Sequence, residues 1–271
     1  MSGAADGERL RAVGRRAANS RTVDALARAG LASRAIIYLL VGILALEIGV
    51  GHGHAQADRS GALHTVAGEP FGMVVLWLLA AGFAALTVWK VTETVPRGRG
   101  TGGRLLDVGR AALYAVICGS VVAFLVGAGA PSSDQQSHAL TADMMKVPGG
   151  RIAVGLIGAA VVITGIVFVV QALRRSFARG LKTELMARIT RRVVLGLGMT
   201  GHVARGVVFG MVGVFLVRAA ITFDPDKAKG LDDTLRSLRD APAGSWLLII
   251  VAAGVCVFAA YSLCEARWHR V

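Results

Sequence analysis

Cysteine is scarce in this chain, which holds three. All three lie inside long apolar runs, and neither their odd number nor their spacing fits a disulfide framework or a pair of metal ligands. The chain also lacks a glycine-rich phosphate loop, a Ser/His/Asp set and paired carboxylates within its apolar runs. These absences argue against an enzyme, and we expect no catalytic residue, no metal and no cofactor.

Acidic residues are also few, because 17 Asp and Glu stand against 30 Lys and Arg, which gives a formal net charge of +13. Such an excess could indicate a nucleic-acid partner, but its distribution indicates a membrane. Basic residues gather in the N-terminal tail, residues 1–22, and in the second and fourth connections between the apolar runs, whereas the other connections are acid-leaning. This alternation is the positive-inside pattern. We therefore expect both termini in the cytoplasm, basic charge facing anionic lipid headgroups, and no nucleic acid.

Charge is nearly absent from six long apolar runs. Each is close to the roughly 20 residues that cross about 30 Å of hydrocarbon as a helix. The sequence therefore predicts an all-α, multi-pass protein of the bacterial plasma membrane with six transmembrane helices. The runs are residues 33–50, 71–91, 108–128, 151–173, 197–220 and 245–265.

One pattern occurs three times, over residues 23–96, 103–175 and 190–267. In each copy, an Arg-x3-aromatic-x3-small stripe lies on the first apolar helix, and a Pro-x-Gly starts the second, since proline needs no amide partner in a first helical turn. We predict three tandem helical hairpins around a pseudo-threefold axis, with each stripe facing a neighbouring hairpin. The stripes are Arg34/Tyr38/Gly42, Arg110/Tyr114/Cys118 and Arg205/Phe209/Gly213, and the helix starts follow Pro70, Pro148 and Pro242.

Each outer loop carries a short apolar stripe just before its proline. Such spacing predicts a short helix that lies in the membrane interface before the chain turns back into the bilayer. The stripes are Leu63 and Val66, Leu140 and Met144, and Leu235 and Leu238.

Two of the arginine stripes resemble a known bacterial membrane family. Their contexts are Gly30-Leu-Ala-Ser-Arg-Ala-Ile-Ile-Tyr38 and Gly201-His-Val-Ala-Arg-Gly-Val-Val-Phe209. Together with the Pro-x-Gly starts, they are similar to the family called domain of unknown function 1206. The resemblance implies three tandem two-helix membrane units from about residue 23 onwards, and it implies no activity. The second copy departs from the pattern at Leu106, Cys118 and Gln171.

Each copy also offers a polar partner for its arginine, 23 residues after the proline. In an antiparallel hairpin, that partner lies beside the arginine at the base. We interpret the pairs as structural clamps, with ion pairs in the first and third copies and a hydrogen bond in the second. The alternative is a ring of three arginines that binds phosphate or a lipid headgroup. The predicted clamps are Arg34 with Glu93, Arg110 with Gln171, and Arg205 with Glu265.

One acid and one base lie well inside the apolar runs. Glu47 and Arg218 each follow the stripe arginine of their copy by 13 residues, about 20 Å along a helix, so we expect them at one depth. An unpaired charge near that depth costs several kcal/mol. We predict that the two residues pair. The alternatives are separate snorkelling to the outer surface and a path for a solute or proton.

Histidines offer the remaining candidate ligands. His52, His54, Asp58 and His64 cluster in the first outer loop, where a His-x-His can bind zinc or copper. The corresponding loops of the other copies lack the cluster, so we interpret it as a solvated polar loop. His202 is the only histidine in an apolar run, and a membrane haem usually needs two axial ligands, which argues against haem.

The sequence favours a non-enzymatic structural or interaction module of the cell membrane, because the repeated residues all have structural explanations. Its expected partners are the bilayer, with anionic lipids at the cytoplasmic face, and another membrane protein. The alternative is a small transporter or channel that uses Glu47 and Arg218, since transporters are also built from tandem repeats. The scarcity of polar residues in the middle of the runs weighs against transport.

Overall fold

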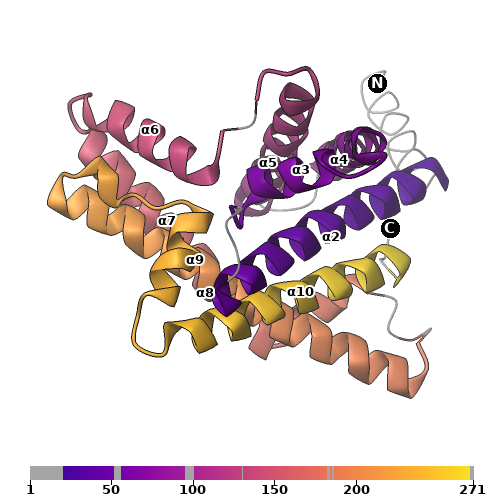
Figure 1. Ribbon diagram of the computed structural model, residues 1–271. Helices are drawn as coiled ribbons and strands as arrows, with labels where there is room; N and C mark the ends of the chain where they lie inside the picture. The colour runs from indigo at the N-terminus through magenta and orange to yellow at the C-terminus, as the bar shows by residue number, and fades with distance from the viewer. Residues whose placement is uncertain are drawn as a thin grey trace, which may run out of the picture.

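The computed structural model describes residues 21–51, 56–94, 101–129, 131–181, 184 and 186–268. Its regular elements are helices, joined by short connections (Figure 1). In chain order they are α2 (Arg21–Val50), α3 (Arg59–Ala67), α4 (Gly72–Thr94), α5 (Thr101–Leu125), α6 (Ser133–Met145), α7 (Gly150–Leu173), η1 (Ser176–Gly180), α8 (Arg188–Thr222), η3 (Pro225–Lys227), α9 (Leu231–Arg239) and α10 (Gly244–Trp268).

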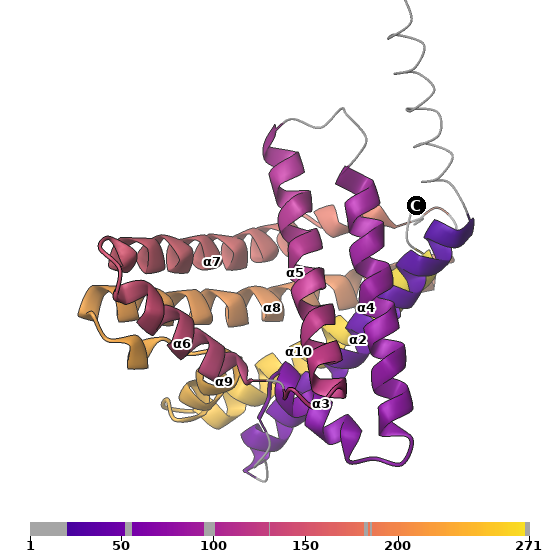
Figure 2. The same cartoon turned by 90° about the horizontal axis from the view of Figure 1, so that it is seen from above.

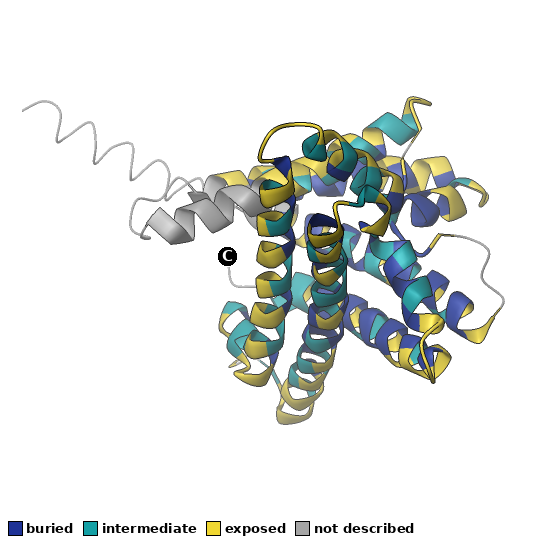
Figure 3. Ribbon diagram, turned by 90° about the vertical axis from the view of Figure 1, so that its left-hand side faces the viewer, coloured by how far each residue is buried: buried dark blue, intermediate teal, exposed yellow. Residues whose placement is uncertain are grey.

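Within the described residues, five helices are long and apolar enough to cross a membrane, namely α2, α4, α7, α8 and α10. Large apolar side chains such as Leu78, Ile163 and Ile250 are exposed on their outward faces, and exposed residues follow the sides of the long helices in Figure 3. Water-soluble proteins rarely leave apolar patches of this extent uncovered. The chain is therefore a multi-pass membrane protein. The remaining predicted span falls on α5, whose apolar part, Ala112–Leu125, is shorter.

The short helices predicted before each proline are present as α3, α6 and α9. Each is followed by the same turn, in which the middle residue of Pro-x-Gly has positive φ: Phe71 (65°), Gly149 (81°) and Ala243 (57°). The next glycine begins the long helix. A Cβ there would collide with a carbonyl of the preceding short helix, on Val66, Met144 or Leu238. The glycine thus lets each long helix start directly against the short one.

The long helices pair between copies rather than within them. The most extensive packing joins α4 to α5, α7 to α8 and α10 to α2, and Figure 2 shows these three pairs running in different directions. Within the copies, α8 packs on α10 nearly as extensively as α4 does on α5, α2 meets α4 less extensively, and α5 hardly touches α7. The predicted hairpin is therefore corrected: the second helix of each copy pairs with the first helix of the next, and α10 closes the ring onto α2.

The arginine stripes lie along these pair interfaces, as predicted. A Cβ on Gly42 of α2 would lie 2.5 Å from Cys256 Sγ of α10, and one on Gly213 of α8 would lie 2.6 Å from the Val162 nitrogen of α7. In the second copy, the Cys118 thiol of α5 donates to the Ala80 carbonyl of α4 at 3.5 Å. The small residue of each stripe therefore allows close approach to the preceding copy.

Candidate functional site

A cavity of about 210 Å³ lies where the three helix pairs meet. At roughly 30 Å³ per molecule, this is the space of about seven waters. Its walls are mostly apolar, with Val41, Phe83, Val208 and Val255 among them. The polar groups in its lining are Arg34, Tyr38, Arg59, Tyr114 and Arg205.

Arg34 of α2 lines the cavity, and its charge is neutralised by Glu265 of the third copy. Its guanidinium donates to the Glu265 carboxylate at 2.5 Å and to the Ser262 hydroxyl at 3.2 Å. Both charged side chains are largely buried, with exposed fractions of 12% and 18%. This buried ion pair joins α2 to α10.

The clamp thus forms between copies and not at the base of a hairpin. The sequence pairs Arg34 with Glu93 of the same copy, but α2 packs most extensively on α10, which carries Glu265. The side chains of Glu93 and Arg110 lie outside the described residues. The direction of helix pairing therefore decides which clamp partner each arginine finds.

Arg205 reaches the same cavity from α8 but has aromatic neighbours in place of a carboxylate. Its Cζ lies 4.5 Å from the ring centre of Phe168, and 5.1 to 5.4 Å from those of Phe258, Tyr38 and Phe209. Its Nε is buried without a hydrogen-bond partner. In the described part of the chain, no carboxylate lies within ion-pair distance of it, because Glu265 is bound to Arg34.

The difference between the two arginines comes from two positions on the facing helix. Ser262 and Glu265 of α10 follow Pro242 by 20 and 23 residues, and Phe168 and Gln171 of α7 follow Pro148 by the same intervals. At these repeat positions α7 has a ring, which lies against Arg205, and a neutral amide, whereas α10 has a hydroxyl and a carboxylate. The Gln171 departure is visible in the sequence, but its relevance to Arg205 depends on the pairing of α7 with α8.

One end of the cavity is lined by α3 and α9. With α6, which is hydrogen-bonded to both, we call these short helices the cap. Arg59 of α3, together with Leu231 and Leu235 of α9, lines the cavity from this side. Both leucines belong to the start and middle of one short helix. Movement of the cap would therefore open the cavity at this end.

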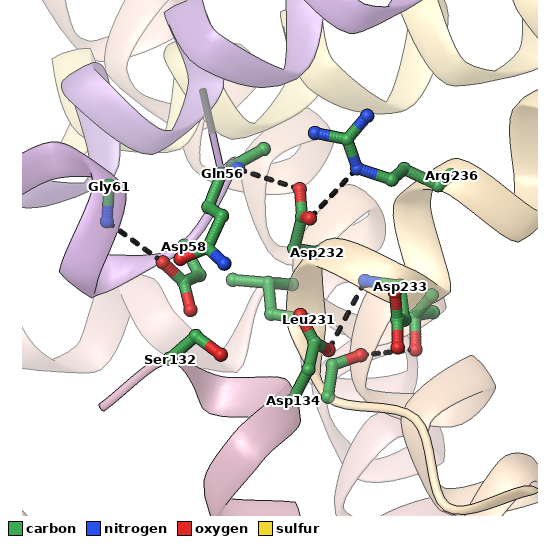
Figure 4. Close-up of polar contacts among 12 residues, drawn as sticks. Gln56, Asp58, Gly61, Ser132, Asp134, Leu231, Asp232, Asp233 and Arg236 are labelled. Carbon is green, nitrogen blue, oxygen red and sulfur yellow. Dashed lines mark hydrogen bonds and ion pairs between the residues drawn. The ribbon is translucent and has the colours of Figure 1, made fainter. Parts of the chain in front are cut away.

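Hydrogen bonds join the three cap helices in a closed ring, and Figure 4 shows the links at Asp134 and Asp232. Asp58 in the first copy accepts from the Ser133 amide of the second at 2.6 Å. Asp134 of the second copy accepts from the Asp233 amide of the third at 3.2 Å. Asp232 of the third accepts from the Ala57 amide of the first at 2.8 Å. Each copy is thus tied to both others.

The carboxylates of the cap titrate differently. Burial raises the pKa of Asp134 to about 6, and the nearby Asp233, Asp232 and Asp58 carboxylates act in the same direction. Burial would also raise the pKa of Asp58, but hydrogen bonds from Gly61, Ser133 and Ser60 outweigh it and lower that pKa. One carboxylate of the ring can therefore take up a proton near pH 6.

The prediction of a solvated loop around the first-copy histidines is wrong for Asp58. Its side chain is buried and caps α3 by accepting from the Gly61 amide at 3.0 Å. His64 packs edge-on against Phe124, with ring centres 4.9 Å apart, and His52 and His54 lie outside the described residues. His202 lies among Phe177, Phe258 and Tyr261, and its Nδ1 is 2.7 Å from the Gly198 carbonyl.

The structure does not bring Glu47 and Arg218 together. Both side chains are exposed, on α2 and α8, and no ion pair joins these two described residues. Neither lines the cavity. The aromatic rings around Arg205 were not predicted from the sequence. Two of them, Tyr38 and Phe209, are the aromatic residues of the stripes, which was the sequence pattern that could have indicated them.

Comparison with known sequences agrees with this repeated architecture. The family described as Domain of Unknown Function (DUF1206) matches residues 29–97, 108–175 and 200–269. A protein of Bacillus subtilis (strain 168), "Uncharacterized protein YxxB", is 28% identical over 242 residues, which cover 87% of each chain. No solved structure matches. Because the three matched segments take in most of the sequence, the chain belongs to the DUF1206 family.

Proposed function

We propose that this protein is a non-enzymatic binding module of the bacterial plasma membrane, which holds an amphiphilic ligand from the bilayer in its central cavity. In this proposal six spans surround a pseudo-threefold axis, the termini are cytoplasmic and the cap faces outward. The observation that carries it is the make-up of the cavity, whose apolar walls surround the guanidinium of Arg205.

The size of the cavity supports an occupant. The cavity has a volume of about 210 Å³ and is partly open, since Leu113 in its lining is 49% exposed, so a molecule can enter it. Water is a poor filler, since it needs several polar partners and the walls are mostly apolar. A ligand with an apolar body and one polar end satisfies both the walls and the arginine.

A small transporter or channel is the second candidate, and the length of the cavity favours it. The lining on α2 runs from Arg34 to Ala45, about 16 Å along the helix, and it ends at the cap. Transport would require the cap to open. Glu47 and Arg218, which the sequence suggested for this role, do not line the cavity.

Filling the cavity tests the binding function. Val208 lines it and is 6% exposed, whereas its neighbour Val207 is 39% exposed. We expect native mass spectrometry of the purified protein to detect a bound small molecule in the wild type and in Val207→Phe, and to lose it in Val208→Phe. Because Val208→Phe fills a void, it should also raise the thermal stability of ligand-free protein. Absence of a bound molecule from the wild type would refute the proposal.

A further inference from the structure

We infer that the ligand carries a carboxylate, which pairs with Arg205 in the place that Glu265 holds at Arg34, and that Phe168 and Gln171 determine this specificity. The inference rests on the proposed binding function and adds the charge and headgroup of the ligand. It depends on a comparison of two arginines at the same repeat position, both lining one cavity.

Arg34 and Arg205 are the first residues of their stripes, and Arg34 shows which groups an arginine binds at this repeat position. There, the facing helix provides a carboxylate at 2.5 Å and a hydroxyl at 3.2 Å. Phe258 also lies beneath the guanidinium, with its ring centre 5.5 Å from Cζ. The arrangement neutralises the charge within the protein.

The Arg205 position keeps the aromatic contact and omits the carboxylate. Four rings surround its Cζ at 4.5 to 5.4 Å. A desolvated cation–π contact is worth about 2 kcal/mol, but a ring face does not replace the in-plane oxygens that the guanidinium fork is built to bind. The Nε is buried without a hydrogen-bond partner in both arginines, so the deficit at Arg205 lies in its terminal nitrogens, which lack the carboxylate and hydroxyl that Arg34 binds.

The position of Arg205 inside an apolar run makes an external counterion valuable. It lies 8 residues after the start of the run 197–220, which is about 12 Å of helix. An unpaired charge in such surroundings costs several kcal/mol. An anionic group from a ligand removes this cost, whereas a neutral headgroup does not.

A carboxylate fits this position better than a phosphate. At Arg34, the space facing the guanidinium accommodates the carboxylate of Glu265 from the facing helix α10. A phosphate brings up to two charges, but Arg34 is already engaged by Glu265, and Arg59 lines the cavity at its cap end. Arg205 would therefore have to neutralise most of the charge. The apolar chain of a monocarboxylate would then lie along Val208, Val41 and Val255.

A single substitution can supply the missing carboxylate from the protein itself. Gln171→Glu places it at the repeat position of Glu265, and Gln171→Met is the matched neutral control. The probes are dodecanoate, dodecyl phosphate and dodecanol, added to protein in nanodiscs of uncharged phosphatidylcholine, with binding measured by native mass spectrometry and thermal shift.

We expect the wild type and Gln171→Met to bind dodecanoate, and Gln171→Glu to bind it at least tenfold more weakly while unfolding at a higher temperature without ligand. Unchanged dodecanoate affinity in Gln171→Glu, or tighter binding of dodecyl phosphate, would overturn the carboxylate inference. If dodecanol binds as tightly as dodecanoate and Val208→Phe abolishes both, the binding function stands and the carboxylate does not. If the wild type binds none of the three, the binding function itself fails.

Discussion

The helix pairs α2/α10 and α7/α8 occupy equivalent places in the repeat, yet different interactions hold them together. A buried ion pair between Arg34 and Glu265 joins α2 to α10. The α7/α8 pair has no such ion pair among the described residues. A Cβ on Gly165 would lie 2.6 Å from the Gly206 carbonyl oxygen, and Arg151 of α7 donates to the Ala220 carbonyl of α8 at 2.7 Å. The repeat therefore determines which helices pack together, while the side chains that hold each interface differ.

The difference between the two interfaces affects which arginine in the central cavity has a carboxylate partner. Close glycine packing and the hydrogen bonds of Arg151 to the Ala220 and Ile221 carbonyls hold α7 to α8, so that pair can leave Arg205 without a protein carboxylate. At α2/α10 the clamp contributes to the interface itself, and Arg34 is not available to a ligand. The same residue type at the same repeat position thus serves structure in one pair and, in our proposal, binding in the other.

The strongest test of the comparison is removal of the α2/α10 carboxylate. Glu265→Ala leaves the Arg34 charge buried and unpaired, so we expect a loss of about 3–5 kcal/mol in the free energy of unfolding. Unfolding in detergent measures it. Glu47→Ala, on an exposed acid of α2, is the control and should change stability by less than about 0.5 kcal/mol. A loss below about 1 kcal/mol in Glu265→Ala would show that the ion pair does not hold α2 to α10.

The matching test for α7/α8 is steric. In Gly165→Val the added atoms meet the backbone of Gly206 and Gly210, and we expect a loss of about 2–3 kcal/mol from forced separation. Gly155→Val, on the same helix, is the control, because its nearest neighbour is the Ala220 Cβ at 3.6 Å. Equal melting temperatures for the two variants would contradict the assignment of close backbone packing to this pair.

A change of pH should act on both pairs together, because it acts on the cap. The pKa of Asp134 is raised to about 6 from an ordinary 3.8, so the folded state binds the proton more tightly than the unfolded state does. Stability should therefore rise as pH falls from about 7 to 4, on the order of 1–2 kcal/mol. Asp134→Asn should remove this rise in a series of melts, and an unchanged slope would refute the assignment.

The smallest effect is expected at Arg205. Without ligand, Arg205→Gln removes the cost of an unpaired charge together with the cation–π contacts that offset it, so stability should change by less than about 1 kcal/mol. Arg34→Gln, the matched variant in the other pair, leaves Glu265 buried without its cation and should cost about 3 kcal/mol. Comparable losses for the two would show that the arginines are held alike.

The sequence predicted the helices and the repeat well, because both depend on local patterns. The Pro-x-Gly positions correctly marked the starts of α4, α7 and α10, and the stripes correctly marked the faces that meet another copy. Helix pairing was not predictable in the same way. Two helices joined by a short loop usually form a hairpin, but here the cap helices separate them, and each finds its main partner in another copy.

That one error accounts for most of what was missed at the site. If each copy forms a hairpin, Glu265 is the predicted partner of Arg205 and Glu93 that of Arg34. Every stripe arginine then has a polar partner in the protein. The left-handed turn residues Phe71 and Ala243 were also not visible, because neither residue type favours positive φ. A residue's own chemistry can be read from sequence, whereas its partner depends on contacts made far along the chain.

Closure of the ring also sets a delay during synthesis. Arg34 and Glu265 are 231 residues apart, and at about 5–20 residues per second the ribosome needs roughly 10–50 s to cover that distance. For that interval α2 is in the membrane with a buried cation whose final partner does not yet exist. The nascent first copy must therefore be held by lipid headgroups or by the insertion machinery until α10 arrives, and a chain that stops before α10 can never complete its first helix pair.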